Sequence, residues 1–309
     1  MTSQDRTNNS GILAIVTLAT IYGLTAVMAR YLSRGLGLFE QWYLRYAIGT
    51  VLCVVCFYTQ VDYHKFIRLA KRDWLVLLFR SFVGSVIGIA LYTLASQKAK
   101  IGPVAFMQVV PTTALFGVVL LKEKMSIKQL SLVLLSFFGA ALVAVRGLHD
   151  LTSFNVGEIY SLVSGALFSL VLIARKWQTN RLNNYEMTVA ITTMSFVMDY
   201  IISVCLYKRA FIASSHWTNH FTLVLLGASV LGVAINFLSS YGFEHVAAIL
   251  ASSLLDLELV MGALFGYLFY HEALTKRELI GGLIILTAAV SMSQLSRRSP
   301  TRPTISIPD

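Results

Sequence analysis

The tetrapeptide Ala114-Leu115-Phe116-Gly117 recurs as Ala263-Leu264-Phe265-Gly266, at an offset of 149 residues in a chain of 309. Each copy lies within a long apolar run, at 101–121 and at 247–270. A helix of that length crosses a hydrocarbon layer of about 30 Å. The repeated segment therefore predicts that the chain lies in a lipid bilayer and that it contains a duplicated half.

The same offset aligns residues on both sides of the tetrapeptide. The further pairs are Tyr92 and Tyr241, Glu123 and Glu272, Leu130 and Leu279, Leu134 and Leu283, and Ala140 and Ala289. A short identity among Leu and Ala arises easily by chance, but a shared register that also aligns the acidic loop residues, at an offset of about half the chain length, does not. An odd number of spans in each half would reverse the second half in the membrane, which is the inverted repeat of many secondary transporters.

Composition and span length predict the fold class. Hydrophobic residues make up 56% of the chain and charged residues 13%, whereas a soluble domain keeps about a quarter of its residues charged. No alternating segments typical of a membrane β-barrel are visible. We expect an all-α integral membrane protein with ten transmembrane helices as two inverted five-helix repeats. The spans are 11–32, 41–59, 74–96, 101–121, 127–146, 157–177, 185–207, 219–241, 247–270 and 277–295.

The loops predict the boundaries and the orientation. We expect a cytoplasmic N-terminus at 1–10, a first repeat at 11–146, a second at 157–295 and a disordered cytoplasmic tail at 296–309. The first apolar run is longer than the core of a signal peptide, so we expect it to be retained as a span. Lys and Arg are more frequent in the segments that are inside when both termini are cytoplasmic. The expected location is a bacterial cytoplasmic or inner membrane.

The remaining composition argues against other classes of protein. The net charge of +10 comes from basic residues in short loops, where lipid headgroups account for it, so we expect no nucleic-acid partner. Cys53, Cys56 and Cys205 all lie in apolar runs and are expected to pack between helices. The six histidines fall in loops or at span ends, without metal-ligand spacing. We therefore expect no enzyme, no metal and no cofactor.

Several loose motifs carry a resemblance to a known family. They are Lys122-Glu123-Lys124-Met125 before a helix with Gly139, His271-Glu272-Ala273-Leu274 before a helix with Gly281-Gly282, and also Tyr22-Gly23, Arg45 and Pro111. Together they resemble the EamA branch of the drug/metabolite transporter superfamily over nearly the whole chain. Two features depart from the family's pattern: Lys122 and His271 stand where glycine is usual, and span nine lacks a proline.

The resemblance implies an architecture and a function. It implies a central cavity lined by spans one, three, four, six, eight and nine, with spans five and ten peripheral and often at dimer contacts. A homodimer would use these peripheral spans. Family substrates are small metabolites, such as amino acids, nucleotide derivatives and drugs, moved without ATP.

Two carboxyls in span nine are the first candidates for a solute site. Asp256 and Glu258 lie near the middle of the span, where an ionisable group is costly and often functional. Residues two apart on a helix point about 200° apart. One carboxyl is therefore expected to line the cavity and the other to lie in a helix contact, unless both pair with Arg45 or Arg80. Arg80 is otherwise expected to extend toward the membrane surface.

Polar residues in other spans complete the candidate site. They are Tyr22, Tyr92 on one face with Ser81, Ser85 and Gly88, Gln108, Asn236 and Ser252. A stripe in span seven, Thr188, Thr192, Ser195, Asp199 and Ser203, either joins helices or meets solute. Glu123 and Glu272 precede helices and are interpreted as caps.

These residues predict a secondary transporter that moves a small metabolite by alternating access. Acidic residues in an apolar cavity favour an amino-acid-like solute, cationic or zwitterionic. The alternatives are an exporter of drugs or nucleotide-derived metabolites, a channel, and a polytopic membrane enzyme.

Overall fold

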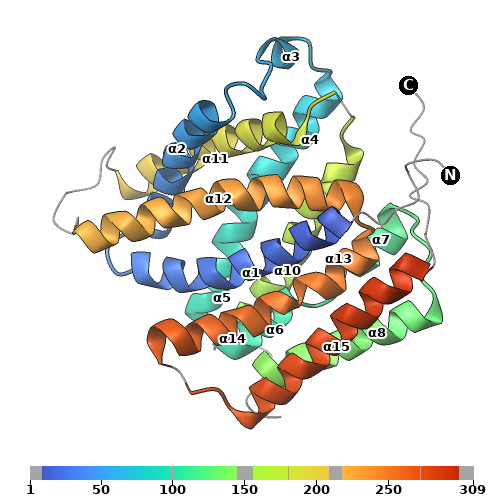
Figure 1. Cartoon of the computed structure of the whole chain (residues 1–309). Coiled ribbons are helices and arrows are strands. Elements are labelled where there is room, and N and C mark those ends of the chain that lie inside the picture. Colours follow the sequence, from blue (N-terminus) through green and yellow to red (C-terminus); the bar gives the residue numbers. More distant parts are fainter. Residues whose placement is uncertain are drawn as a thin grey trace.

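A computed structural model describes residues 9–98, 101–144, 156–179, 181–208, 218–271 and 273–298, and every regular element in these ranges is a helix (Figure 1). The first half contains α1 (Asn9–Leu32), α2 (Leu38–Cys56), α3 (His64–Ile67), α4 (Lys71–Ser81), the π-helix η1 (Phe82–Gly88), α5 (Ile89–Lys98), α6 (Ile101–Gln108), α7 (Thr112–Leu120) and α8 (Ile127–Ala144). The second contains α10 (Val156–Ile173), the 3₁₀ turn η2 (Ala174–Trp177), α11 (Asn184–Tyr207), α12 (Asn219–His245), α13 (Ala248–Leu255), α14 (Leu257–Tyr270) and α15 (Lys276–Arg298).

Eight helical stretches are long and apolar enough to cross a membrane, and a shorter apolar stretch covers Val104–Leu120. The eight are Asn9–Leu32, Lys71–Ala95, Ile127–Ala144, Val156–Trp177, Asn184–Tyr207, Asn219–His245, Ala248–Tyr270 and Lys276–Ser296. The count of ten thus stays a prediction. The predicted span 41–59 corresponds to α2, which begins with Glu40, Gln41 and Arg45 in its first turns and is less apolar for that reason.

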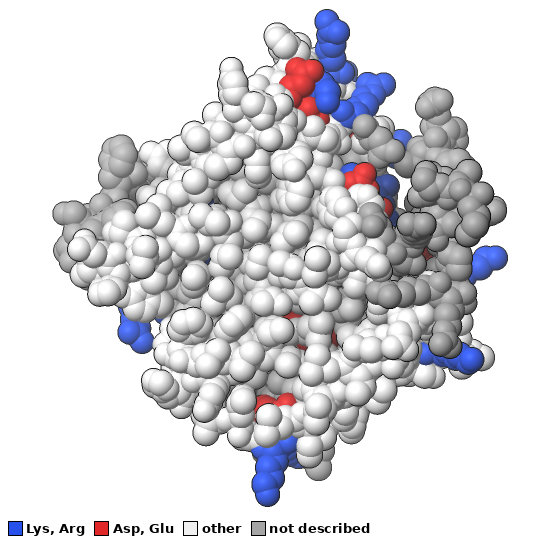
Figure 2. Space-filling model, in the orientation of Figure 1, with Lys and Arg blue, Asp and Glu red and all other residues white. Residues whose placement is uncertain are grey.

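The surface agrees with a protein embedded in lipid. In Figure 2 the Lys and Arg side chains gather around the rim of the view, and a broad face between them is almost free of charged residues. Large apolar side chains such as Leu134, Phe138, Leu283 and Val290 are more than half exposed. A soluble protein rarely exposes so large an apolar surface.

Helix contacts in the two halves match one another. Helix α1 packs against α12 and α14 of the second half. Its counterpart α10 packs against the equivalent segments of the first half, namely η1 and α5, and α6 and α7. The pairs α2 with α11 and α8 with α15 each join equivalent helices across the two halves. In the last pair, the α-carbons of Gly139 and Gly281 bring the two backbones close, since a Cβ on Gly139 would lie 2.9 Å from the carbonyl oxygen of Gly281.

Two of the central apolar segments are interrupted helices. Residues 109–111 separate α6 from α7, because Pro111 has no N–H to continue the helix. Asp256 separates α13 from α14 without any proline. The Leu259 N–H donates to the Asp256 carbonyl, a hydrogen bond between residues three apart instead of the four of an α-helix. Interrupted helices at membrane depth occur where backbone is buried in protein or lines a cavity. A third irregularity, the π-helix η1, lies in the middle of Lys71–Ala95.

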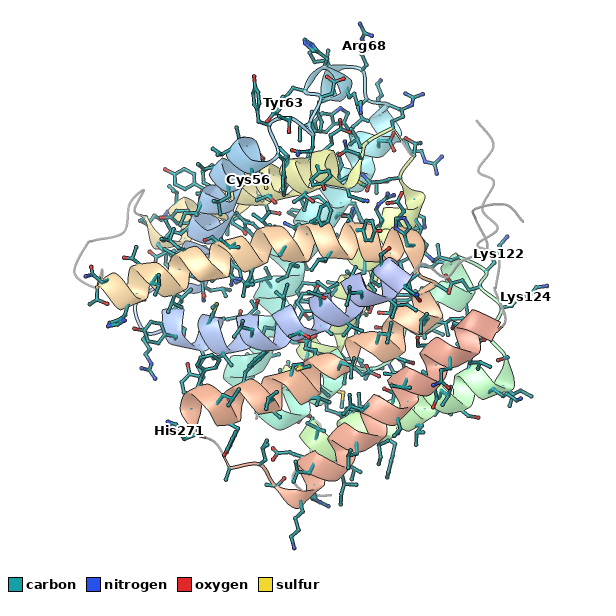
Figure 3. The ribbon with its side chains drawn as sticks, in the orientation of Figure 1. Cys56, Tyr63, Arg68, Lys122, Lys124 and His271 are labelled. Carbon is teal, nitrogen blue, oxygen red and sulfur yellow. The ribbon has the colours of Figure 1, made fainter. Side chains whose placement is uncertain are left out.

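Two equivalent loop positions adopt the same unusual backbone. Lys122 after α7 and His271 at the end of α14 have φ of 55° and 54°, in the left-handed region that favours glycine. They are 149 residues apart, and in Figure 3 they lie at opposite ends of the bundle. The left-handed backbone explains why the family resemblance calls for glycine at both places.

The terminal segments are described only in part. Residues 9 and 10 of the predicted terminus 1–10 belong to α1, and α15 extends to Arg298, into the predicted tail 296–309. The other residues of both segments lie outside the described residues.

Candidate functional site

Glu258 lies in the first turn of α14, at the broken helix in the centre of the bundle. It is half-buried, and within the described part of the chain it has no hydrogen bond or ion pair. The Tyr22 side chain on α1 interacts electrostatically with it. One turn further along α14, a Cβ added to Gly262 would meet no heavy atom within 4 Å. There is thus free space beside Glu258 on the same face of the helix.

Asp256 points to a different neighbour. Its side chain is buried, and Ser136 Oγ on α8 donates a hydrogen bond of 2.5 Å to Asp256 Oδ2. The two carboxyls of span nine therefore diverge as helical geometry predicts. Glu258 lies toward α1 and the free space, while Asp256 lies in a contact with the peripheral helix α8.

Arg80, on α4, is a basic residue that acts electrostatically on Tyr22. Its side chain is 3% exposed, so the expectation that it extends to the membrane surface is wrong. Nη1 donates to Gln178 Oε1 at 3.0 Å, Nη2 donates to Ser240 Oγ at 3.1 Å, and Nε has no partner among the residues that the structure describes.

Pairing of the span-nine carboxyls with arginine does not occur among the described residues. Arg45 donates from Nη2 to the Ala228 carbonyl at 3.3 Å and lies 4.1 Å from the centre of the Trp42 ring. Both partners of Arg80 are neutral. The half-buried Glu258 and the buried Arg80 are therefore two opposite charges that share a neighbour, Tyr22, without forming an ion pair among the described residues.

The other candidates lie in helix contacts around this centre. Gln108 Nε2 donates to Ser164 Oγ on α10 at 3.1 Å, and Asn236 Nδ2 donates to Thr192 Oγ1 on α11 at 3.0 Å. Ser252 is buried within α13. The structure therefore brings Tyr22 and Glu258 together, and it places Gln108, Asn236, Ser252 and Asp256 in separate contacts.

Tyr92 does not share a face with the polar residues that precede it. Ser81 and Ser85 are buried, whereas Tyr92 is 40% exposed. The prediction assumed an uninterrupted α-helix, but the π-helix η1 closes its hydrogen bonds five residues apart. The residues after Gly88 are therefore rotated about the helix axis relative to where an uninterrupted α-helix would place them, and Tyr92 faces outward.

The polar stripe of span seven is buried between helices. All five of its residues are at most 2% exposed. Thr192 accepts from Asn236 on α12, and Ser195 is hydrogen-bonded to Tyr46 on α2. The interpretation as a helix contact thus agrees with the structure. Within the described ranges, neither carboxylate oxygen of Asp199 in the same stripe has a hydrogen-bond partner.

Glu123 is a cap, but not of the helix that follows it. Its carboxylate accepts from the backbone N–H groups of Ala248 and Ile249, at 2.9 and 3.1 Å, which are the first residues of α13 in the other half. The Lys176 ammonium also donates to it at 2.9 Å. Its repeat partner Glu272 lies outside the described residues.

Two groups of residues were missed from the sequence. Tyr46 interacts electrostatically with Tyr22, and residues 175–179 form a dense set of contacts at one end of the bundle. The adjacent basic residues Arg175 and Lys176 are a visible signal of this segment in the sequence. Among the described residues, no group of three or more His, Cys, Asp or Glu could hold a metal.

Two grooves lie away from the centre. One of about 410 Å³ runs between α8 and α15, and one of about 180 Å³ lies beside Tyr31, Arg34 and Phe221. The lining of the first is Ile127, Lys128, Ser131, Leu132, Ser291, Gln294 and Leu295. Neither groove includes Glu258 or Arg80.

Comparisons with known proteins agree with this architecture. An uncharacterized transporter of Synechocystis sp. is 21% identical over 77% of this chain and 71% of its own length. An uncharacterized transporter of Archaeoglobus fulgidus is 25% identical over 65% of this chain and 70% of its own. One crystal structure superimposes with a TM-score of 0.76 at 14% identity, over 94% of this chain and 98% of that chain, which shows the fold alone.

The sequence pattern of the EamA-like transporter family matches the chain twice, at residues 9–145 and 155–294. The two matches cover nearly all of the helical bundle, and the apolar helices agree with a multi-pass protein of the cell membrane. The chain belongs to the EamA-like transporter family.

Proposed function

We propose that the protein is a secondary transporter for a small zwitterionic, amino-acid-like solute, which it moves by alternating access. The observation that carries this proposal is the arrangement of Glu258 and Arg80 around Tyr22. Both charges lie inside the bundle, both interact electrostatically with Tyr22, and neither has an ion-pair partner among the described residues.

Unpaired charges in a bilayer are unfavourable. A single charged side chain at the bilayer centre costs several kcal/mol unless a partner or water compensates it. A solute with one ammonium and one carboxylate supplies both missing partners. The carboxylate would meet Arg80, whose Nε–H has no acceptor in the described part of the chain, and the ammonium would meet Glu258.

Alternating access is supported by the duplicated architecture. The equivalent residues Lys122 and His271 lie at opposite ends of the bundle (Figure 3), which is expected for two halves of opposite orientation. Two inverted five-helix repeats at 11–146 and 157–295 would place the same elements at both membrane faces. The interrupted segments α6–α7 and α13–α14 lie at equivalent places in the two halves.

Solute class can be tested with purified protein. We would screen thermal stability against neutral amino acids, their amides, which lack the carboxylate, and their N-acetyl forms, which lack the ammonium. The expected result is stabilisation by the zwitterions and a weaker effect of both singly charged analogues. Equal stabilisation by the amides would contradict the role of Arg80.

The residues can be tested by uptake into proteoliposomes, with the solute that stabilises best. Glu258→Gln and Arg80→Gln should each reduce uptake at least about tenfold, because each leaves the opposite charge of the solute without a partner. The matched control is Asp256→Asn in the same helix break, which should retain uptake and lower thermal stability. Loss of uptake in Asp256→Asn with full activity in Glu258→Gln would reverse the assignment.

A further inference from the structure

Residues 175–179, at the end of α10, contact α4, α11, α12 and the loop after α7, and we call this segment the 175–179 clasp. Its first residue, Arg175, forms an ion pair of 3.0 Å with Glu244 at the end of α12. The Arg175 guanidinium is almost fully buried, whereas Glu244 is one-third exposed. Asn184, which begins α11, also donates to Glu244 at 2.7 Å. The ends of α10, α11 and α12 are thereby joined.

The second residue of the clasp joins the two halves of the chain. Lys176 Nζ donates to Glu123 Oε1 at 2.9 Å, and both side chains are nearly buried. Glu123 in turn accepts from the backbone N–H groups of Ala248 and Ile249. One carboxylate thus links the end of α7, the end of α10 and the start of α13.

The last residues of the clasp bind α4. The Thr179 backbone N–H and Oγ1 donate to the two oxygens of Asp73, at 2.9 and 2.6 Å. The Trp177 carbonyl accepts from Arg72 at 3.4 Å. Gln178 accepts from Arg80 at 3.0 Å. Asp73, although acidic and near the start of α4, is only 1% exposed, so the carboxylate of this contact is buried while Thr179 is partly exposed.

We propose that the 175–179 clasp is the gate at the membrane face that carries Lys122 and Lys124, and that it opens and closes as one unit. This inference rests on the proposed transport function. Solute can leave by this face only if the ends of α4, α7, α12 and α13 separate. The clasp binds α4 and α12 directly, and through Glu123 it is joined to the end of α7 and the start of α13. Five consecutive residues each hold a different partner, so displacement of η2 breaks all of these contacts together.

The chemistry of the clasp suits a gate better than a permanent joint. Buried ion pairs and charged hydrogen bonds stabilise a fold little compared with apolar packing, because their groups are also well solvated when released to water. Such contacts can therefore open at low net cost. Apolar contacts between the same helix ends would have to expose hydrocarbon to water each time.

Arg80 connects the gate to the solute site. Its Nη1 belongs to the clasp through Gln178, while its charge acts on Tyr22 beside Glu258. A solute carboxylate that binds Arg80 competes with Gln178 for the same guanidinium. Binding of solute thus shifts the equilibrium toward the open clasp, by the difference in affinity between the two states.

Hydrogen exchange measures this opening directly, because three backbone amides donate to Asp73 or Glu123, the two carboxylates that the clasp contacts. They are the N–H groups of Thr179, Ala248 and Ile249. Their exchange reports opening of the Asp73 contact on one side and of the Glu123 contact on the other. The experiment uses the full chain in detergent or nanodiscs, without any solute.

We expect that a substitution at either contact, that of Asp73 or that of Glu123, increases the rate of amide exchange at both contacts. Lys176→Met removes the ammonium from Glu123 but leaves Glu123 bound to the backbone N–H groups of α13. It should accelerate amide exchange of Thr179 by about 5- to 30-fold, as loss of one charged contact predicts. Asp73→Asn should accelerate Ala248 and Ile249 similarly. Thr179→Val is the milder second variant if Asp73→Asn folds poorly. The matched control is Lys128→Met, a basic residue in the groove between α8 and α15, which should change neither side.

Acceleration confined to the altered contact would overturn the clasp as a single gate. A result in which both sides respond but no zwitterion stabilises the protein would overturn the proposed solute and leave the clasp standing. If a zwitterion does stabilise the protein, its addition to the wild type should accelerate all three amides. Protection of the three amides instead would contradict the link through Arg80.

Discussion

At the scale of single residues, Lys122 and His271 show how one backbone requirement recurs in both halves. Each has a φ near 55°, where a side chain with a Cβ costs about 1–2 kcal/mol. Glycine removes that cost but has more freedom to lose on folding. We predict that Lys122→Gly and His271→Gly each raise stability by about 0.5–1 kcal/mol, measured as the midpoint of thermal unfolding in detergent.

The control for this prediction lies two residues away. Lys124 carries the same charge in the same loop, but among the described residues it is not one of those with positive φ. Lys124→Gly should therefore leave the midpoint unchanged or lower it. An equal gain from Lys124→Gly would show that loss of charge, and not backbone conformation, is responsible.

At the scale of helices, the approach of α1 to α14 depends on Gly23. A Cβ at this position would lie 2.7 Å from the backbone nitrogen of Gly262 and 3.0 Å from the carbonyl carbon of Met261. Backbone atoms of a packed helix cannot move away from the added Cβ as the end of a flexible side chain can. We predict that Gly23→Ala destabilises the protein by about 1–3 kcal/mol and displaces Tyr22, so that uptake falls as well.

Gly232→Ala on α12 is the matched control for Gly23→Ala. A Cβ there would meet no heavy atom within 4 Å, and alanine favours a helix over glycine by about 1 kcal/mol. Gly232→Ala should therefore keep or slightly raise the unfolding midpoint, in the same detergent assay. A loss of stability in Gly232→Ala equal to that of Gly23→Ala would refute the close approach as the cause.

At the scale of the whole molecule, the orientation of the two halves is the central prediction. Ser126 and Thr275 are equivalent loop residues, 149 apart, that follow Lys122 and His271. If the repeat is inverted, they lie on opposite membrane faces, Ser126 inside and Thr275 outside. Single cysteines at the two positions, in a chain without Cys53, Cys56 and Cys205, would be labelled in intact cells with an impermeant thiol reagent.

The expected outcome is labelling at Thr275→Cys and protection at Ser126→Cys until the membrane is opened. Labelling of both positions from the same side would contradict the inverted repeat. The reverse pattern would keep the repeat and turn the whole molecule over in the membrane. In that case the 175–179 clasp would lie at the outer face.

The sequence by itself determined the features that depend on local order along the chain. Runs of apolar residues set where helices cross the membrane, because backbone hydrogen bonds must be satisfied within the segment. The register between tetrapeptides indicated the duplication that the family match at 9–145 and 155–294 reflects. The spacing of Asp256 and Glu258 predicted that the two carboxyls diverge, and they do so in the structure, although the helix is interrupted at Asp256.

Only the tertiary structure decided which distant groups meet. Glu123 caps a helix 125 residues away, and Arg80 binds Gln178 and Ser240 across the bundle. Tyr92 turned outward because the chain adopts a π-helix at η1, which no pattern of residues in that span signals. The physical reason is the same throughout: periodicity fixes the face of one regular helix, whereas irregular turns and partners across the bundle depend on how all the helices pack together.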